Sequence, residues 1–407
     1  MLATDAEALA AYAAHSEQTR QPRDARRAFA NLHIEAVYDT LTESRSRYLR
    51  LPELTRAAAR RFPGLVPTPG QLAAERERAQ ADKEGLDIDL GVFCGAVLRS
   101  PTAGRHLIDA MLLPTPRALE LLGTFRRTGR VELRSILVER RGVAAEVTFR
   151  NAHCLNAEDD TLVADLETAV DLALLDDAVR VGVLRGGTVD HPKYRGRRVF
   201  SAGINLKELH AGRISFIDFL LGRELGCLNK IARGLLTAPQ ADAWSERTTQ
   251  KPWIGAVDSF AIGGGMQLLL VLDRVIAETG AYFSLPAADE GIVPGLGSLR
   301  LTRLTGARPA RRVILAGYRV EATGPEGRLL CDEVVPPEQM QEAVDRAVTD
   351  LAAPAVTANR HMLFLAEEPI DMFRTYLAEF AVLQPVRTHS ADVLAKTERY
   401  TTRKDAS

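Results

Sequence analysis

The spacing of hydrophobic and polar residues divides the chain into three parts. Apolar residues recur at helical intervals over residues 1–130, which predicts a helical N-terminal domain. The pattern changes near residue 131 and stays mixed to about residue 335. Helical spacing then returns over residues 336–407, first as an apolar stripe at 340–351 and then as one long helix at 362–383. We therefore predict three regions, with the α/β core in the middle.

The middle part carries the pattern of strands alternating with helices. Alternating apolar residues on both sides of Arg141-Gly142 predict a β-hairpin over residues 131–149. Leu162, Leu166, Val170 and Leu174 then follow at helical spacing, and three short strands are expected at 179–183, 253–257 and 274–277. Such alternation is typical of an α/β fold in which helices pack on the faces of a sheet.

Composition and charge exclude several classes of protein. The chain has 407 residues, of which 46% are hydrophobic, and a formal net charge of −1, so no partner of strong charge such as nucleic acid is expected. Its four cysteines are widely separated, which favours reduced thiols over disulfides or a zinc site. No N-terminal signal peptide is evident, and no apolar stretch approaches the roughly 18 residues that span a bilayer. We predict a cytoplasmic protein without a membrane anchor.

Two glycine-bearing segments are the candidates for chemistry. In the first, residues 199–208, Gly203 allows a backbone conformation that leaves the next N–H exposed. In the second, residues 253–268, a strand leads into Gly263-Gly264-Gly265 at the start of an apolar helix. The first N–H groups of a helix lack intrahelical partners and lie at the positive end of its dipole, so this segment favours an anion.

A glycine run has a second explanation, which is close packing of a helix against its neighbour. Taken alone, the two explanations are equally good. Gly295-Leu296-Gly297 lacks the third glycine of a dinucleotide-binding fingerprint and follows a proline. Neither a GxSxG nucleophile elbow nor a GxxxxGK[ST] phosphate loop is present.

The two segments together resemble a known family. FSAGINLKE, IGAVDSFAIGGGMQL, LDRVIA and YFSLPAADEGIVPGLGSLRLTRLTG occur in the order that is typical of the enoyl-CoA hydratase/isomerase, or crotonase, superfamily. The resemblance implies a spiral of ββα units in which the N–H groups of Ile204 and Gly264 bind a thioester oxygen. It also implies that Gly265 lies beside the substrate, that Lys207 and Arg198 (with Arg195 and Arg197) bind coenzyme A, and that the C-terminal helices form a homotrimer or homohexamer.

The sequence departs from the family at its two catalytic glutamates. Gln267 stands at one of these positions, and Ala287 stands at the other, after Pro286. Neither side chain can take a proton at neutral pH, so hydration of an enoyl-CoA is not expected. Asp289 and Glu290 follow closely and could replace the missing base, although a surface position explains them equally well.

A narrower resemblance offers a use for the N–H groups of Ile204 and Gly264 without those glutamates. A helical N-terminal region before the core, together with Gln267, is similar to the branch of the superfamily that oxidises dihydroxyphenylacetyl-CoA with O2. That resemblance implies an enolate that reacts directly with O2, without a metal or other cofactor. Arg223, Glu158 and Gln267 are the candidates for contacts with the ring hydroxyls; for Arg223, an ion pair or a solvated helix face is the simpler alternative.

Other functions stay open at this point. A thioester hydrolase or a C–C lyase could use Asp289 or Glu290 as its base. A non-catalytic subunit that binds coenzyme A could keep the fold after losing both glutamates. The eight histidines show no HxxxH or HxD spacing, so no metal site is expected.

Overall fold

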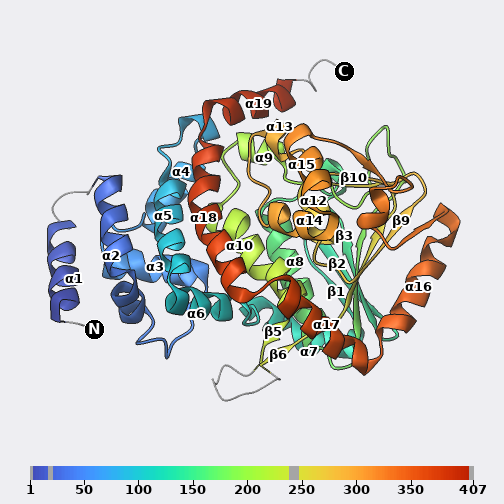
Figure 1. Ribbon diagram of the computed structural model, residues 1–407, viewed down its shortest axis with the longest axis horizontal. Coiled ribbons are helices and arrows are strands. Elements are labelled where there is room, and N and C mark those ends of the chain that lie inside the picture. The colour runs from blue at the N-terminus through green and yellow to red at the C-terminus, as the bar shows by residue number, and fades with distance from the viewer. Residues whose placement is uncertain (1–2, 17–21, 238–246, 403–407) are drawn as a thin grey trace.

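The computed structural model describes residues 3–16, 22–237 and 247–402. Figure 1 shows the N-terminal helices at one end of the molecule and the main sheet at the other. The long C-terminal helix α18 lies between them. The fold is thus a mixed α/β core with helical parts before and after it, as the sequence predicts.

The N-terminal part consists of helices. Several of them begin with proline in the first turn after a Ser or Thr cap, such as Thr68, whose side chain accepts from Gln71 N–H. The elements are α1 (Ala3–Ser16), α2 (Arg23–Leu41), α3 (Leu51–Arg61), α4 (Pro69–Arg76), η1 (Gln80–Asp82), α5 (Leu86–Arg99), α6 (Pro101–Met111) and α7 (Pro116–Thr128).

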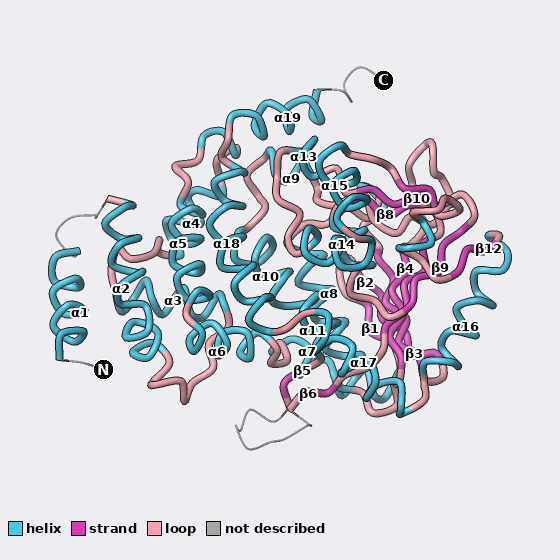
Figure 2. Tube along the Cα trace, in the orientation of Figure 1, coloured by secondary structure: helices cyan, strands magenta, loops and turns pink. Residues whose placement is uncertain are grey.

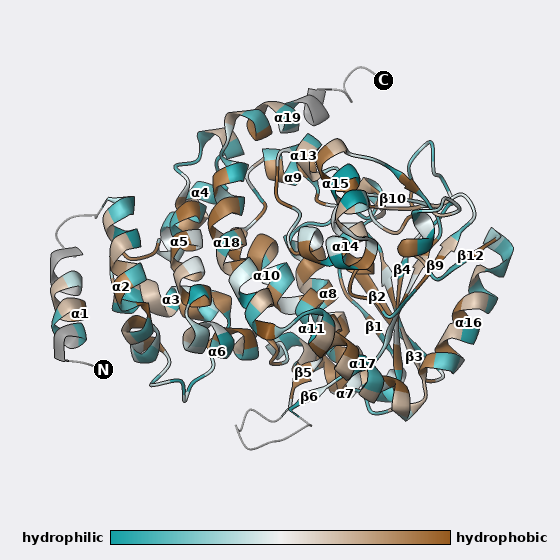
Figure 3. Cartoon of the chain, in the orientation of Figure 1, coloured by the Kyte–Doolittle hydropathy of each residue, from teal (hydrophilic) through white to brown (hydrophobic). Residues whose placement is uncertain are grey.

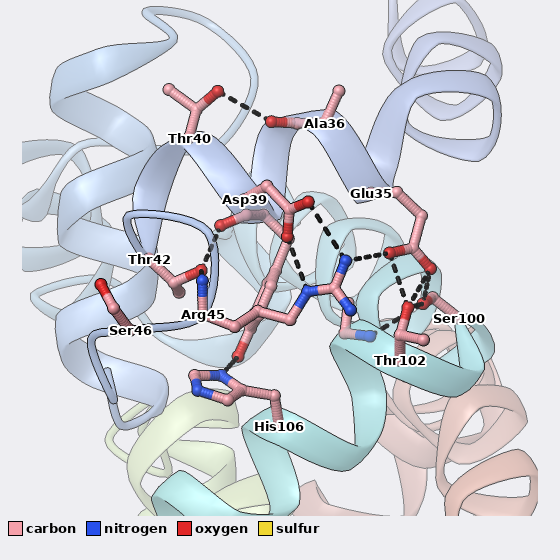
Figure 4. A network of polar contacts seen from close by, with 12 residues as sticks. Glu35, Ala36, Asp39, Thr40, Thr42, Arg45, Ser46, Ser100, Thr102 and His106 are labelled. Carbon is pink, nitrogen blue, oxygen red and sulfur yellow. Dashed lines mark hydrogen bonds and ion pairs between the residues drawn. The ribbon is translucent and has the colours of Figure 1, made fainter. Parts of the chain in front are cut away.

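Charged side chains tie α2 to the start of α6 (Figure 4). Arg45 donates from Nε to Asp39 Oδ1 over 2.7 Å and pairs with Glu35 over 3.5 Å. Glu35 in turn accepts the hydroxyl of Thr102 over 2.7 Å. Because these groups are partly exposed, each contact contributes at most about 1 kcal/mol.

The core is a seven-stranded sheet with the order β1-β2-β3-β4-β7-β9-β12. β2 and β3 form the predicted hairpin, and the strands from β3 onward run parallel. Figure 3 shows hydrophobic colouring on these strands and around α10. The strands are β1 (Arg130–Glu132), β2 (Ile136–Arg141), β3 (Ala144–Phe149), β4 (Val181–Gly186), β7 (Trp253–Val257), β9 (Arg274–Glu278) and β12 (Glu333–Val335).

One expected strand is in fact two. Residues 131–138 divide into β1 and β2 because the chain turns at Ser135. The N–H and hydroxyl of Ser135 both donate to Asp165 Oδ2, over 2.8 and 2.9 Å, which fixes the turn against α8. The strand expected at 179–183 begins instead at Val181, since Val179 belongs to a turn closed by Asp176.

Two small sheets and a set of short helices complete the core (Figure 2). The strands are β5 (Leu235–Leu236), β6 (Thr248–Thr249), β8 (Phe260–Ile262), β10 (Tyr282–Ser284) and β11 (Val320–Glu321). The helical elements are η2 (Ala152–Cys154), α8 (Asp160–Leu175), α9 (Leu206–His210), η3 (Phe216–Leu220), α10 (Leu221–Arg223), η4 (Glu224–Leu228), α11 (Asn229–Arg233), α12 (Gly264–Leu269), α13 (Ala287–Glu290), α14 (Gly297–Thr305), α15 (Ala307–Ala316) and η5 (Gly327–Leu329).

The C-terminal part differs from expectation in one respect. η6 (Pro337–Gln339) leads into α16 (Met340–Leu351), which matches the predicted stripe. The single helix expected at 362–383 is instead α17 (Pro354–Glu367) and α18 (Ile370–Thr388), followed by α19 (Ala391–Thr402). Pro369 separates the first two, because proline cannot continue a helix through its missing N–H.

Helix α18 packs tightly on α5 of the N-terminal part. A Cβ atom added to Gly91 would lie 2.2 Å from Ala381 O, and one added to Gly95 would lie 2.8 Å from Val382 Cγ2. Glycine at these two positions therefore lets the helix backbones approach each other. This packing matters for function because α18 also forms one wall of the candidate site.

A buried ion cluster joins α8 to α11 beneath the site. Lys230 Nζ, with no exposed surface, lies 2.7 Å from Asp171 and 2.8 Å from Glu167. Lys230→Met would leave Asp171 without its cation and Glu167 with Arg50 alone, so we expect the free energy of unfolding to fall by about 3–5 kcal/mol. Urea denaturation measures this, with Lys207→Met, an exposed lysine, expected within about 0.5 kcal/mol of the unmodified protein.

Candidate active site

The two glycine segments meet at one place in the fold. Ser201 pairs with Ala261 as parallel strands do, and Ile262 N–H donates to Ser201 O over 2.9 Å. Gly203 has a φ of 83°, which favours glycine, and a Cβ added there would lie 3.3 Å from Gly264 N. The amide of Ile204 and the amide of Gly264 are thus brought to the same small region.

Both residues line one cavity, and their amides are unused within the described part of the protein. Ile204 and Gly264 line the same pocket, and neither N–H donates to any residue within the described ranges. The Gly264 amide belongs to the first turn of α12, where helical N–H groups lack intrahelical acceptors. This arrangement supports the prediction of an oxyanion hole at Ile204 and Gly264, in which two unpaired N–H groups would stabilise negative charge on a substrate oxygen.

A buried ion pair forms the wall beside the hole. Arg223 is 3% exposed and Glu158 is 1% exposed. The guanidinium donates from Nε to Glu158 Oε2 over 2.5 Å and from Nη2 to Oε1 over 3.2 Å. It also donates to Gly264 O over 2.7 Å, so the arginine holds both the carboxylate and the peptide that follows the hole.

The same arginine has no donor left for a ligand. Its Nη1 donates to Glu224 Oε1 over 3.1 Å and to Gln267 Oε1 over 3.2 Å. Together with the contacts to Glu158 and Gly264, these use all five N–H groups of the guanidinium. The geometry therefore favours a positioning role for Arg223, and the predicted direct contact with substrate would require one of these partners to move.

Gln267 and Glu158 each have a hydrogen-bonding group that Arg223 does not use. Because arginine can only donate, the amide oxygen of Gln267 must face Arg223, which leaves its NH2 group for the cavity. Glu158 accepts from Arg223 at both oxygens, and each oxygen retains a lone pair. The wall thus offers one donor and one anionic acceptor side by side.

The charges in this wall balance. Arg300, behind Glu224, pairs with Glu368 over 2.9 Å, and Glu368 also pairs with Arg233 over 3.1 Å. Burial lowers the pKa of the Arg223 guanidinium, but the carboxylates of Glu158 and Glu224 outweigh it, so the net pKa is raised. The Arg223 guanidinium therefore stays charged at neutral pH.

The helix that carries Arg223 is irregular on both sides of it. π-helical turns at Phe216–Leu220 and Glu224–Leu228 enclose the short α-helical segment that ends at Arg223. Such turns are rare and occur frequently at functional sites. The helix ends at Arg233, because Gly234 adopts a φ of 82° and β5 follows.

The segment after β10, which includes Gly295, also lines the cavity. A Cβ added to Gly295 would lie 2.2 Å from Glu224 Oε1 and 3.0 Å from Gln267 Oε1. Gly295 belongs to the run that lacks a complete dinucleotide-binding fingerprint. Its role is instead to let the chain pass close to Glu224 and Gln267. The glycine is visible in the sequence, but its structural role becomes clear only from the fold.

Helix α18 closes the cavity with Phe380 and Gln384, two residues that sequence reasoning missed. Gln384 Oε1 accepts from Val293 N–H over 2.8 Å and so fixes the segment after β10 that lines the cavity. No local motif marks these positions, because they reach the site only through packing of α18. The N-terminal helices hold α18 in place, which connects that part of the chain to the site.

The remaining predicted residues lie in different surroundings. Gly265 packs on Ser201, since a Cβ added to it would lie 2.8 Å from Ser201 Cβ. Arg198 donates to Gly186 O over 3.1 Å, and Lys207 is exposed at the start of α9. None of the three lines the cavity. Their roles in binding coenzyme A or substrate remain predictions.

Gln267 and Ala287 both line the cavity at the positions of the expected glutamates. Three carboxylates line the cavity, and Glu158 and Glu224 are paired with Arg223. The third is Glu290, at the end of α13. In the described part of the chain, no group of three or more His, Cys, Asp or Glu side chains has metal-binding geometry.

Comparison with known proteins places this geometry in a family. The enoyl-CoA hydratase/isomerase family matches residues 139–368, more than half of the chain. The chain belongs to this family. It is 58% identical over 374 residues to (3,5-dihydroxyphenyl)acetyl-CoA 1,2-dioxygenase of Amycolatopsis orientalis, covering 92% of this chain and 86% of that one.

Other members of the enoyl-CoA hydratase/isomerase family match less of the chain. A probable enoyl-CoA hydratase of Rhizobium meliloti is 31% identical and covers 54% of this chain and 76% of its own. The solved enoyl-CoA hydratase/isomerase from Pseudoalteromonas atlantica T6c has a TM-score of 0.55 at 20% identity, covering 66% of this chain and 98% of its own. The dioxygenase match is thus long enough to extend into the N-terminal helices, whereas the shorter matches leave much of the chain uncovered.

Proposed function

We propose that the protein is a dioxygenase that converts 3,5-dihydroxyphenylacetyl-CoA and O2 to 3,5-dihydroxyphenylglyoxylate and coenzyme A, without a metal or other cofactor. The observation that carries the proposal is the pairing of an intact oxyanion hole with Gln267 and Ala287 in place of the family's two glutamates. The long match to the Amycolatopsis orientalis dioxygenase supports the same activity.

The hole performs the first part of the reaction. Removing a proton from the carbon alpha to a thioester moves negative charge onto the thioester oxygen. The amides of Ile204 and Gly264 stabilise that charge without reorganising, and losing one such donor typically costs about 10²–10³ in rate. The aryl ring shares the charge, which makes this carbanion easier to form than that of a simple acyl thioester.

The polar wall fits a dihydroxyphenyl ring. Glu158 can accept a phenolic O–H, and the NH2 group of Gln267 can donate to a phenolic oxygen. Arg223 holds both side chains in place through its contacts to each. Phe219, Leu220 and Phe380 supply apolar surface for the faces of the ring.

Oxygen then consumes the carbanion. An electron passes from the enolate to O2, and recombination forms a peroxide on the alpha carbon. The peroxide oxygen attacks the thioester carbonyl, the C–S bond breaks, and cleavage of the O–O bond yields the aryl glyoxylate. Delocalised carbanions can reduce O2 directly, so this route requires no metal.

We extend three further expectations to the assembled protein. Lys207 and Arg198 are proposed to contact the phosphates of coenzyme A. A homotrimer or homohexamer is proposed, with support from exposed apolar side chains on α14, α15, α17 and α18, including Leu304, Leu315, Met362 and Leu363. A cytoplasmic location is proposed as well; every helix in the described ranges is too short or too polar to cross a membrane.

An oxygen electrode tests the activity. Chelator-treated, metal-free protein is mixed with 3,5-dihydroxyphenylacetyl-CoA while free thiol is measured in parallel. We expect one O2 consumed for each thiol released. Thiol release that continues without O2 would instead identify a hydrolase or lyase, and tight coenzyme A binding with neither signal would identify a non-catalytic subunit.

A further inference from the structure

One carboxyl group in the cavity, that of Glu290, takes no part in the ion pairs around Arg223. Glu290 lines the same cavity as Ile204, Gly264 and Arg223. In the parts of the chain that the structure describes, its side chain forms no ion pair and accepts no hydrogen bond. Glu290 is half-buried, and its carboxyl is available to a ligand in the cavity.

Its neighbour Asp289 points elsewhere. A Cβ added to Gly317, at the end of α15, would lie 2.3 Å from Asp289 Oδ2, and Asp289 is exposed. Asp289 does not line the cavity. Of the two carboxyl groups that the sequence offers as replacement bases, the fold thus directs only Glu290 toward the hole.

The cations that pack near Glu290 are engaged with other groups. From α18, Arg387 Nε donates to Gly291 O over 2.7 Å, and its Nη2 pairs with Asp392 of α19 over 2.5 Å. Lys396 of α19 donates to a backbone carbonyl of α13 over 3.1 Å. The cation of Arg223, which lines the same cavity, is held by Glu158 and Glu224. Glu290 therefore has no counterion.

This environment sets how Glu290 titrates. Burial, with a smaller contribution from the charge of Asp289, raises the pKa of the Glu290 carboxyl to about 7. A group with a pKa near the working pH can both take and return a proton during one turnover. The family glutamates missing at Gln267 and Ala287 leave this task unassigned.

We infer that Glu290 accepts the alpha proton of the arylacetyl thioester and returns it to the departing thiolate of coenzyme A. The inference rests on the proposed dioxygenase function. In the first step the C–H bond breaks, its electron pair enters the enolate held by the hole, and the proton moves to Glu290.

The proton balance of the whole reaction is consistent with that cycle. When the C–S bond breaks, the thiolate takes the proton from Glu290 and leaves as a thiol. The second alpha proton leaves as the O–O bond breaks; the Glu290 carboxylate accepts it and passes it to solvent. The sum is ArCH2C(O)S-CoA + O2 → ArC(O)COO⁻ + CoA-SH + H⁺, and O2 accepts all four electrons that the alpha carbon loses.

Proton exchange in the absence of oxygen tests the inference separately from the oxygen chemistry. The protein is incubated anaerobically with the arylacetyl-CoA in D2O, and loss of the alpha-proton signal is followed by NMR. Glu290→Gln keeps the shape but cannot act as a base, so exchange should slow by about 10²–10⁴-fold. Asp289→Asn, the matched control, removes only the smaller contribution to the Glu290 pKa and should exchange within a few-fold of the unmodified rate.

The pH profile provides the second readout. In the unmodified protein the base form lies above the pKa, so kcat/KM and the exchange rate should rise with pH through about 7 and then level. Glu290→Gln should lose this rise while still binding the thioester. If Glu290→Gln does not fold, Glu290→Asp should retain the rise at a reduced rate.

Exchange by Glu290→Gln at the unmodified rate, or a Glu290→Asp profile without the rise near pH 7, would overturn the inference. A failed dioxygenase proposal gives a different result. In that case the unmodified protein consumes no O2, even if it exchanges the alpha proton.

Discussion

Replacing Gly264 with valine is expected to lower kcat/KM by at least about 10²–10³-fold. A Cβ atom at this position would lie 2.4 Å from Glu158 Oε1. The carboxylate cannot move away cheaply, because Arg223 holds both of its oxygens in a buried pair. The substitution should therefore displace the Gly264 amide from the hole and disturb the wall that positions the ring.

A glycine outside the site gives the matched control. Gly280 has open space around the position of an added Cβ, and its φ is ordinary. Gly280→Ala should keep kcat/KM within about twofold, and circular dichroism should report the same fold for both variants. A Gly264→Val enzyme with nearly full activity would show that the hole lies elsewhere.

Replacing Arg223 with lysine should reduce kcat/KM by about 10²-fold or more even though the positive charge remains. Lysine has one ammonium group and cannot reproduce the planar guanidinium that contacts Glu158, Glu224, Gln267 and Gly264 together. We expect Glu158 and Gln267 to lose their fixed orientation, so the ring hydroxyls should bind more weakly and in more than one pose. Steady-state oxygen consumption gives kcat and KM separately.

The control for this variant is a buried arginine away from the cavity. Arg360 is 3% exposed and pairs with Asp273 over 2.7 Å. Arg360→Lys should lower the midpoint of thermal unfolding, as Arg223→Lys does, but change kcat/KM only a few-fold. Equal losses of activity in the two variants would indicate that Arg223 acts only through stability.

Sequence reasoning could single out the two glycine segments, which the fold brings together, because their signals are local. Gly203 and the run at Gly263–Gly265 are needed for backbone conformation and close approach, and those requirements are visible in the residues themselves. The family resemblance supplied the pairing of the two segments, which no spacing rule gives. Helix α8 and strands β7 and β9 were also predictable, because their apolar periods are regular.

The features that the sequence did not predict all depend on tertiary contacts. Arg223 could be singled out in the sequence, but the engagement of all five of its donors depends on Glu158 and on Gly264 and Gln267 of α12, as well as on the adjacent Glu224. Phe380 and Gln384 reach the cavity only because α18 packs on α5. Gly295 is explained only once Glu224 is placed beside it. Each requires the assembled fold.

The source of the product oxygen atoms tests the central claim most directly. The protein is given 3,5-dihydroxyphenylacetyl-CoA under ¹⁸O2 in ordinary water, and the aryl glyoxylate is reduced at once with borohydride to stop exchange of its ketone oxygen. The account predicts two ¹⁸O atoms in each product molecule, one at the alpha carbon and one in the carboxylate. A carboxylic acid product without ¹⁸O would show that water, not oxygen, attacks the thioester, and would contradict the account.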